Sequence, residues 1–162
     1  MTGIRVGIIT ISDRSYRSKR EDLSGPAIKV YVENFHLVLA DYLIVPDEVP
    51  KIVKAVNSLS KISDLILTTG GTGLSPRDVT PEAMDKLIEK ELPGISEAIR
   101  AVSFQKTPMG ILSRGKAGVY NNTLIVNLPG SPKAVREILD SIFIALIHGV
   151  EVLKGVGKHF GG

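Results

Sequence analysis

The sequence predicts an α/β fold: a three-layer sandwich in which helices cover both faces of a mostly parallel sheet, with a small hairpin added. Two observations predict it. Short apolar runs alternate with longer amphipathic runs, which is the pattern of strand–helix–strand units. The first run, 4–11, is apolar on both faces, as in a central parallel strand. At 162 residues, the chain is expected to form one domain, 1–162, with a frayed tail at 155–162.

The first half of the chain is predicted to hold three strands and two helices. Ser24 and Pro26 mark a helix start, because serine caps the free amides of a first turn and proline tolerates that position. Pro46 ends the second strand, and apolar residues three and four apart give the second helix one buried face. The expected strands are 4–11, 37–45 and 64–69, and the helices between them are 24–35 and 50–60.

The second half is predicted to hold three helices and the hairpin. Thr80 is the expected N-cap of a helix with Pro81 at its first position, and Ser131 with Pro132 repeats that start. A polar turn at 120–122 separates two strand-like runs, as in a β-hairpin. The expected helices run from 80 to about 90, from 94 to about 104, and from 131 along the C-terminal segment, and the hairpin lies within 110–128.

Composition limits the classes of function. The chain has no cysteine, which excludes disulfides and thiolate metal sites, and its three histidines are too scattered for a transition-metal site. The net charge of +3 comes without an aromatic platform or a basic stripe, so no nucleic-acid partner is expected. The most apolar run, 142–147, is too short to cross a bilayer, and the N-terminus shows no signal pattern. No membrane partner and a cytoplasmic location are therefore expected.

The segment TGGTG at 69–73 directly follows the third predicted strand. Glycines there let the backbone turn sharply with successive N–H groups pointing outward, which is how a loop makes a nest for an anion. Three glycines in four residues, beside threonine hydroxyls, favour phosphate binding over a tight turn alone. The segment matches neither a Walker A loop nor the G-x-G-x-x-G spacing, so the common nucleotide-binding loops do not explain it.

Two carboxylates follow strand ends near this loop: Asp47 after the second strand, and Asp78 five residues beyond Gly73. Because the carboxyl ends of parallel strands meet at one edge of a sheet, both are expected beside the phosphate nest. Bare carboxylates would repel a phosphate there, and a Mg²⁺ ion between carboxylate and phosphate oxygens would remove the conflict. The alternatives are a helix-dipole role for Asp78 and a solvated turn position for Asp47.

A series of motifs resembles one family over essentially the whole chain. The motifs are ISDR at 11–14, EDLSGP at 21–26, VPDE at 45–48, LTTGGTGLSPRDVTPEA at 67–83, PG at 93–94, LSR at 112–114 and LIVNLPGSPKAV at 124–135. With them the chain is similar to the MoaB/Mog family of molybdenum cofactor biosynthesis, the molybdopterin adenylyltransferases. The resemblance implies a molybdopterin-binding-like fold and Mg²⁺-dependent transfer of AMP from ATP to the terminal phosphate of molybdopterin, with release of pyrophosphate.

Carried over by position, the resemblance also implies roles for individual residues. Asp47 and Asp78 match the acidic residues regarded as catalytic, and they would hold the metal. The matching substrate-binding residues are Ser12, Asp13, Thr69, Gly70, Gly71, Thr72, Gly73, Ser113, Asn127, Pro129, Gly130 and Ser131. The family further implies a homotrimer or a higher multiple, and a molybdenum insertase as a partner.

Several alternatives stay open at this point. The chain could be a non-catalytic molybdopterin-binding or scaffold subunit, or a nucleotide pyrophosphatase of the CinA type, which shares this fold and a similar glycine loop. The loop 14–22 is interpreted as solvated and mobile, with closure over the ATP phosphates as the alternative. Arg77 either clamps a phosphate or pairs with a neighbouring carboxylate. His148, on an apolar helix, is interpreted as a packed or capped residue.

Overall fold

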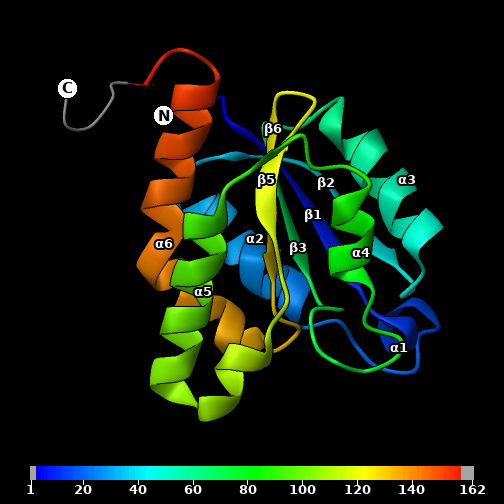
Figure 1. Cartoon of the computed structure of the whole chain (residues 1–162). Helices are drawn as coiled ribbons and strands as arrows, with labels where there is room; N and C mark the ends of the chain where they lie inside the picture. The colour runs from blue at the N-terminus through cyan, green and yellow to red at the C-terminus, as the bar shows by residue number, and fades with distance from the viewer. Residues whose placement is uncertain (1–2, 158–162) are drawn as a thin grey trace.

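The computed structural model describes residues 3–157, which form a six-stranded sheet with helices on both faces (Figure 1). The strand order is β2-β1-β3-β6-β5-β4. The first four strands in this order are parallel, and β5 and β4 continue the sheet in antiparallel pairs. The strands are β1 Arg5–Ile11, β2 Val38–Val45, β3 Leu65–Thr69, β4 Lys90–Glu91, β5 Ala117–Tyr120 and β6 Thr123–Leu128. The predicted α/β class and the hairpin, β5–β6, are confirmed.

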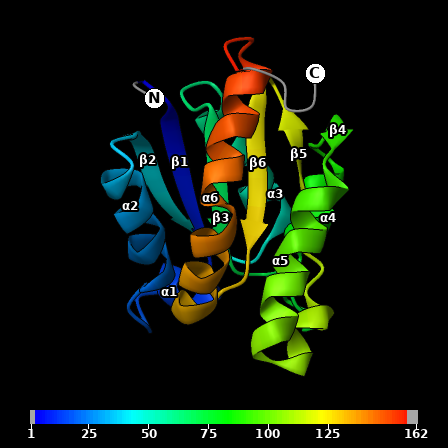
Figure 2. The same cartoon turned by 90° about the vertical axis from the view of Figure 1, so that its left-hand side faces the viewer.

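Helices cover both faces of the sheet. On one face lie α2, α5 and α6, which Figure 2 shows in front of the strands, and on the other lie α3 and α4. The helices are α1 Asp13–Tyr16, α2 Ser24–Asn34, α3 Val49–Ser60, α4 Thr80–Asp85, α5 Pro93–Lys106 and α6 Pro132–Leu153, with a 3₁₀ helix, η1, at Pro108–Leu112. Within residues 3–157, none of these helices combines the length and the apolar character that crossing a membrane requires.

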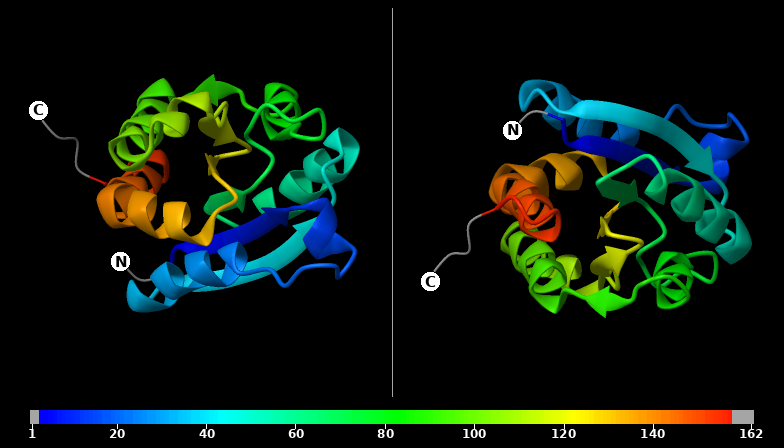
Figure 3. Two further views of the ribbon diagram at one scale, coloured as in Figure 1. Left: turned by 90° about the horizontal axis from the view of Figure 1, so that it is seen from below. Right: turned by 90° about the horizontal axis from the view of Figure 1, so that it is seen from above.

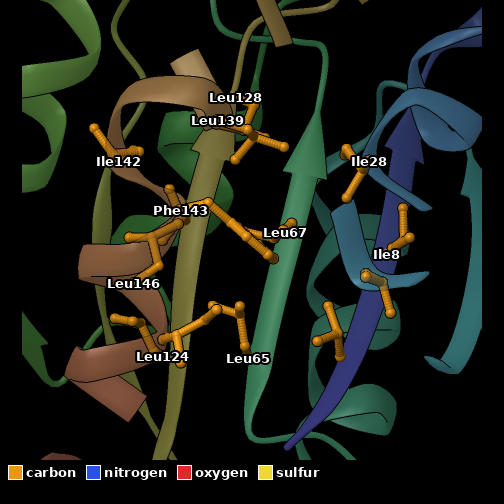
Figure 4. Packing of buried hydrophobic residues seen from close by; sticks show 14 of the residues in the cluster. Ile8, Ile28, Leu65, Leu67, Leu124, Leu128, Leu139, Ile142, Phe143 and Leu146 are labelled. Atoms are coloured by element: carbon orange, nitrogen blue, oxygen red, sulfur yellow. The ribbon is translucent and has the colours of Figure 1, made fainter. Parts of the chain in front are cut away.

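The core is divided in two by the sheet. Successive side chains of a strand point to opposite faces, so Leu65 and Leu67 of β3 pack on the α6 side while Ile66 packs on the α3 side. Figure 4 shows Phe143 of α6 lying over Leu67. Phe143 is only 1% exposed, and burial of a side chain of this size contributes about 1.5–3 kcal/mol. Both faces of the central strands are therefore buried, as the sequence of 4–11 predicted.

Two predicted N-caps were wrong. Ser24 lies inside the first turn of α2, and its hydroxyl donates to the carbonyl of Gly130 instead. The free amides of Ser24 and Gly25 are accepted by the carboxylate of Asp22. Thr80 likewise lies inside α4, where its hydroxyl donates to the carbonyl of Gly70. In both cases the hydroxyl donates to a carbonyl outside the helix and does not accept from a main-chain amide of the first turn, as an N-cap would.

Other elements differ from their predicted lengths. The helix α4 ends at Asp85 rather than near Lys90. The amide of Glu89 donates to Val119 and the amide of Leu92 to Ala117, so this segment joins the sheet as β4. Neither β4 nor the short α1 and η1 were predicted. By contrast, Ser131 caps α6 as predicted, because its Oγ accepts from the amide of Ala134.

The C-terminal end of α6 is hydrogen-bonded beyond the helix. Gly155, with φ +76°, donates to Val152, and Val156 and Gly157 donate to Glu151. Three residues of the predicted frayed tail, 155–157, are thus part of a helix cap. The remainder of that predicted tail, 158–162, lies outside the described residues.

The parallel strands end at one edge of the sheet, which faces the viewer in the left view of Figure 3. The register pairs Ile11 with Val45, and Thr69 with Leu128. The loops that follow β1, β2, β3 and β6 therefore begin side by side. All but one of the predicted site residues lie on these loops or at the strand ends that lead into them.

Candidate functional site

A cavity of about 730 Å³ opens at this edge. It is lined by the loops after the four parallel strands and by residues 20–24 at the start of α2. Nine of the fourteen predicted site residues line it: Ser12, Asp13, Asp47, Thr69, Gly70, Gly71, Asp78, Gly130 and Ser131. The sequence thus predicted correctly that residues from separate strand ends gather around one space.

The glycine turn after β3 needs glycine at two positions. Gly70 and Gly71 have φ of +102° and +70°, which residues with a Cβ rarely adopt. A Cβ on Gly70 would lie 2.2 Å from the carbonyl oxygen of Ile11, and one on Gly71 would lie 2.3 Å from the hydroxyl of Thr80. The turn therefore packs its bare backbone between the end of β1 and the start of α4.

Some main-chain amides of this turn donate to other parts of the protein and others do not. The Gly70 amide donates to the carbonyl of Leu128, so it is not available to a ligand. Among residues 3–157, no acceptor takes the amides of Gly71, Thr72 and Gly73. Of these three residues only Gly71 lines the cavity, so the amide surface that faces a ligand there is smaller than the sequence predicted.

Asp13 and Asp47 hold each other at the ends of β1 and β2. The Asp13 amide donates to Oδ2 of Asp47 over 2.8 Å, and the Asp47 amide donates to Oδ1 of Asp13 over 3.0 Å. Arg77 donates to both oxygens of Asp13, over 2.9 and 3.0 Å. Of the two predicted roles for Arg77, the structure shows pairing with a neighbouring carboxylate.

The pKa values of the Asp13 and Asp47 carboxyl groups are shifted in opposite directions. Hydrogen bonds from Arg77 lower the pKa of Asp13, against the effect of burial, so this carboxylate is held ionised. Burial raises the pKa of Asp47; the amide of Asp13 lowers it, but the negative charges of Asp13 and Asp78 raise it further. Asp47 is therefore a half-buried carboxylate close to two other carboxylates, those of Asp13 and Asp78.

Asp47 and Asp78 each present one free oxygen. Oδ2 of Asp47 accepts from the Asp13 amide, and Oδ2 of Asp78 accepts from the Ser75 amide. Within the described chain, neither Oδ1 accepts a hydrogen bond. Each carboxylate is thus oriented by a main-chain amide and retains an oxygen for a ligand.

These donors fit a magnesium ion that also binds substrate. Across residues 3–157, no group of three or more His, Cys, Asp or Glu side chains is placed to hold a metal. Mg²⁺ needs only one or two carboxylates when substrate phosphates supply the other oxygens. A cation beside Asp47 would also stabilise its ionised form against burial and the negative charges of Asp13 and Asp78, which together raise its pKa.

Five predicted site residues do not line the cavity: Thr72, Gly73, Ser113, Asn127 and Pro129. Asn127 is 1% exposed; its side chain accepts from the amide of Lys116 and donates to the hydroxyl of Thr68. The carbonyl of Pro129 accepts from the hydroxyl of Thr69. These contacts support the walls of the cavity from behind.

The cavity wall also contains residues that the sequence analysis did not name as site residues, among them Arg14, Arg20, Asp22, Ser24 and Ser75. Asp22 accepts from the hydroxyls of Thr10 and Tyr42 in addition to the two amides of α2. An aspartate two residues before a predicted helix start is a signal that could have identified this cap. The loop 14–22 therefore contributes two arginines to the wall and is anchored at its end.

Fold and cavity together define a class. This is a three-layer α/β protein with a positive-φ glycine turn and two oriented carboxylates at the carboxyl edge of its parallel strands. The chain belongs to the family described as "Probable molybdopterin binding domain", whose model matches residues 7–149. The resemblance seen in the sequence motifs is thus confirmed.

Named relatives extend this result. The chain is 42% identical to the molybdopterin adenylyltransferase of Helicobacter pylori (strain ATCC 700392 / 26695), over 96% of this chain and 90% of that protein. It is 43% identical to the molybdenum cofactor synthesis protein cinnamon of Drosophila melanogaster, over 94% of this chain but 26% of that protein. The crystal structure of MoaB from Thermus thermophilus, a molybdopterin biosynthesis enzyme, superposes with a TM-score of 0.88 at 46% identity, covering 96% of this chain and 99% of that one.

Proposed function

We propose that this chain is a molybdopterin adenylyltransferase, which transfers AMP from ATP to the terminal phosphate of molybdopterin in molybdenum cofactor biosynthesis. The observation that carries the proposal is that Asp47, Asp78 and the first two glycines of the turn, Gly70 and Gly71, line one cavity. The names of the relatives, which include molybdopterin adenylyltransferase, agree with it. Since ATP is the second substrate, we place this activity in the cytoplasm.

The reaction joins two polyanions, so positioning and charge neutralisation are its main demands. A terminal phosphate oxygen of the pterin attacks the α-phosphorus of ATP, and the bond from that phosphorus to the oxygen bridging the β-phosphate breaks. Pyrophosphate leaves with the electron pair of that bond. A phosphate monoester with a second pKa of roughly 6 is already ionised at neutral pH, so no side chain has to remove a proton.

The residues of the chain supply the binding surfaces for these groups. The free amide of Gly71, which lines the cavity, would donate to one phosphate, and Arg14 and Arg20 add positive charge to the cavity wall. The free Oδ1 atoms of Asp47 and Asp78 would hold Mg²⁺, which supplies neutralisation of the charge on the departing pyrophosphate. Removing Mg²⁺ with a chelator should abolish AMP transfer, and adding it back should restore the rate.

One assay separates this function from its alternatives. Purified protein is mixed with molybdopterin, ATP and Mg²⁺ and followed for pyrophosphate and adenylylated pterin. Formation of both products, only when pterin is present, supports the transferase. Tight pterin binding without pyrophosphate would indicate a scaffold subunit, and hydrolysis of a dinucleotide without pterin would indicate a CinA-type pyrophosphatase.

We further propose that the chain works as a homotrimer or a higher multiple. Four apolar side chains near the end of α5 and in η1 are largely exposed: Phe104, Met109, Ile111 and Leu112. Contact between copies would remove such side chains from water. Light scattering on the purified protein gives the mass in solution, and a monomer would contradict this part of the proposal. The partner that we propose to receive the product is a molybdenum insertase, and a pull-down with the adenylylated pterin present tests it.

A further inference from the structure

The segment 73–78 carries Asp78 to the cavity, and neither burial nor main-chain pairing with a strand holds its backbone. Its only apolar side chain of any size, Leu74, is 67% exposed, so burial does not anchor the segment. Within the segment, the Asp78 amide donates to the carbonyl of Ser75, and the Ser75 amide donates to Oδ2 of Asp78. These two bonds close a turn. The Arg77 side chain ties the middle of that turn to Asp13 beyond β1, but this ion pair is partly exposed and leaves the backbone at the two ends of the segment without an anchor.

A single arginine from another part of the chain holds both ends of this segment. Nε of Arg114 donates to the carbonyl of Gly73 over 2.9 Å, and Nη2 donates to the carbonyl of Asp78 over 2.9 Å. The main-chain amide of Arg114 also donates to the carbonyl of Thr72 over 2.8 Å. One residue thus bonds to the backbone immediately before the segment, at its first residue and at its last.

The guanidinium group is itself held in orientation by Glu82 of α4. Nη1 of Arg114 lies 2.7 Å from Oε2 of Glu82, and Nη2 lies 3.3 Å from Oε1. Arg114 does not line the cavity, so it acts on Asp78 from behind the wall. A planar guanidinium can serve two carbonyls and a carboxylate at once, whereas a lysine ammonium cannot match this fork.

We infer that Arg114 is a positioning residue, which clamps segment 73–78 so that the Asp78 carboxylate is presented to the substrates in the cavity. For the reaction that it serves, this inference rests on the proposed adenylyl transfer. Loss of the clamp would leave the cavity and most substrate contacts in place but let Asp78 move. Turnover should therefore fall while substrate affinity changes little.

The test compares Arg114→Gln with the wild-type protein by two independent measurements. Hydrogen–deuterium exchange of the amides in 74–78 should become about 10-fold faster or more, because their turn is no longer tied at both ends. The kcat for AMP transfer should fall about 10- to 100-fold, with KM for ATP and molybdopterin within about twofold of the wild-type values. Arg114→Lys should behave almost like Arg114→Gln.

Arg5→Gln is the matched control. The Arg5 guanidinium also donates two hydrogen bonds to one carboxylate, Asp64, but at the opposite end of β1 from the cavity. This variant should lose stability without a change in kcat or in exchange of 74–78. Equal effects of the two variants would show that general destabilisation, not the clamp, is responsible.

Two further results would overturn the inference. Unchanged exchange of 74–78 in Arg114→Gln would show that the segment needs no clamp. Recovery of kcat in Arg114→Lys would show that only the positive charge matters. If the wild-type protein itself transfers no AMP, the proposed function fails, and the exchange measurement still decides whether Arg114 holds the segment.

Discussion

Asp13 and Asp47 form a reciprocal pair of hydrogen bonds: the main-chain N–H of each residue donates to the carboxylate of the other. Because these residues follow β1 and β2, the two hydrogen bonds continue the pairing of the two strands beyond the sheet. It also fixes which oxygen of Asp47 points into the cavity. The position of Asp47 therefore depends on Asp13, although the negative charges of the two carboxylates repel each other.

This dependence predicts a specific effect of Asp13→Ala. The variant removes the acceptor of the Asp47 amide, which should cost about 1–3 kcal/mol of unfolding free energy. The Asp13 main-chain amide would still donate to the Asp47 carboxylate, but the backbone of Asp47 would lose its hydrogen bond to Asp13, and kcat should fall about 10- to 100-fold as Asp47 shifts. Urea unfolding and steady-state kinetics measure the two effects.

Asp13→Asn is the informative comparison. Its amide oxygen can still accept from Asp47, although the ion pair with Arg77 is lost. Activity closer to that of the wild-type protein is expected. If Asp13→Asn is as impaired as Asp13→Ala, then the charge of Asp13, and not its bond to Asp47, is what the site needs.

Asp78→Asn tests the chemistry more directly. The amide group keeps an oxygen that can accept from Ser75, so the fold and pterin binding should persist. Loss of the charge that would hold Mg²⁺ should lower AMP transfer about 100-fold or more. Circular dichroism and pterin titration report on the fold and on binding, and pyrophosphate release reports on turnover. Wild-type turnover in this variant would exclude Asp78 from the mechanism.

The sequence was sufficient for every strand of the sheet except β4 and for the edge where the cavity lies. Apolar runs of strand length and the rule that parallel strands share a carboxyl edge placed Asp47, Asp78 and the glycine turn together. Both patterns are local in the chain or follow from general topology, so no three-dimensional detail was needed. The long C-terminal helix with Ser131 as its cap follows for the same reason.

The sequence could not predict which of several possible partners a polar side chain bonds to in the folded chain. Ser24 and Thr80 have the residue type of N-caps, but carbonyls of Gly130 and Gly70 accept from their hydroxyls in the folded chain. Arg114 lies far along the chain from the carbonyls that it binds, in a segment with no helical or strand periodicity. Such pairings depend on the packing of distant loops, which local patterns do not encode.

Gly70→Ala should be strongly destabilising, because a Cβ would lie 2.2 Å from the carbonyl oxygen of Ile11 and φ is +102°. Strain of this kind costs about 1–3 kcal/mol, before any displacement of β1. Gly94→Ala is the matched control, since a Cβ there meets nothing within 4 Å and lies in α5. That variant should be neutral or more stable by up to about 1 kcal/mol. Equal stability of the two variants in urea unfolding would contradict the proposed packing of the turn.

Asp64 lies at the end of the sheet opposite the cavity, and its ionisation should make the free energy of unfolding depend on pH. Burial raises the pKa of its carboxyl, but hydrogen bonds from Arg5 and the charges of Arg5 and Lys154 outweigh burial, so the pKa lies below its usual value. A carboxyl with a lowered folded-state pKa stabilises the protein above its unfolded-state pKa of about 4, and this stability is lost as the pH falls through the folded-state value. Asp64→Asn should therefore be less stable than the wild-type protein near neutral pH.

The difference between the two proteins should shrink on acidification below about pH 4, because the protonated Asp64 of the wild-type protein then resembles the neutral asparagine. Urea unfolding of both proteins across this range measures the difference directly. Arg5→Gln removes the main partner from the other side and should flatten the same acid limb, since Lys154 alone, 3.4 Å from Asp64, would remain. A gap between wild type and Asp64→Asn that stays constant with pH would mean that the carboxylate contributes through packing and shape, and that its charge adds nothing to stability.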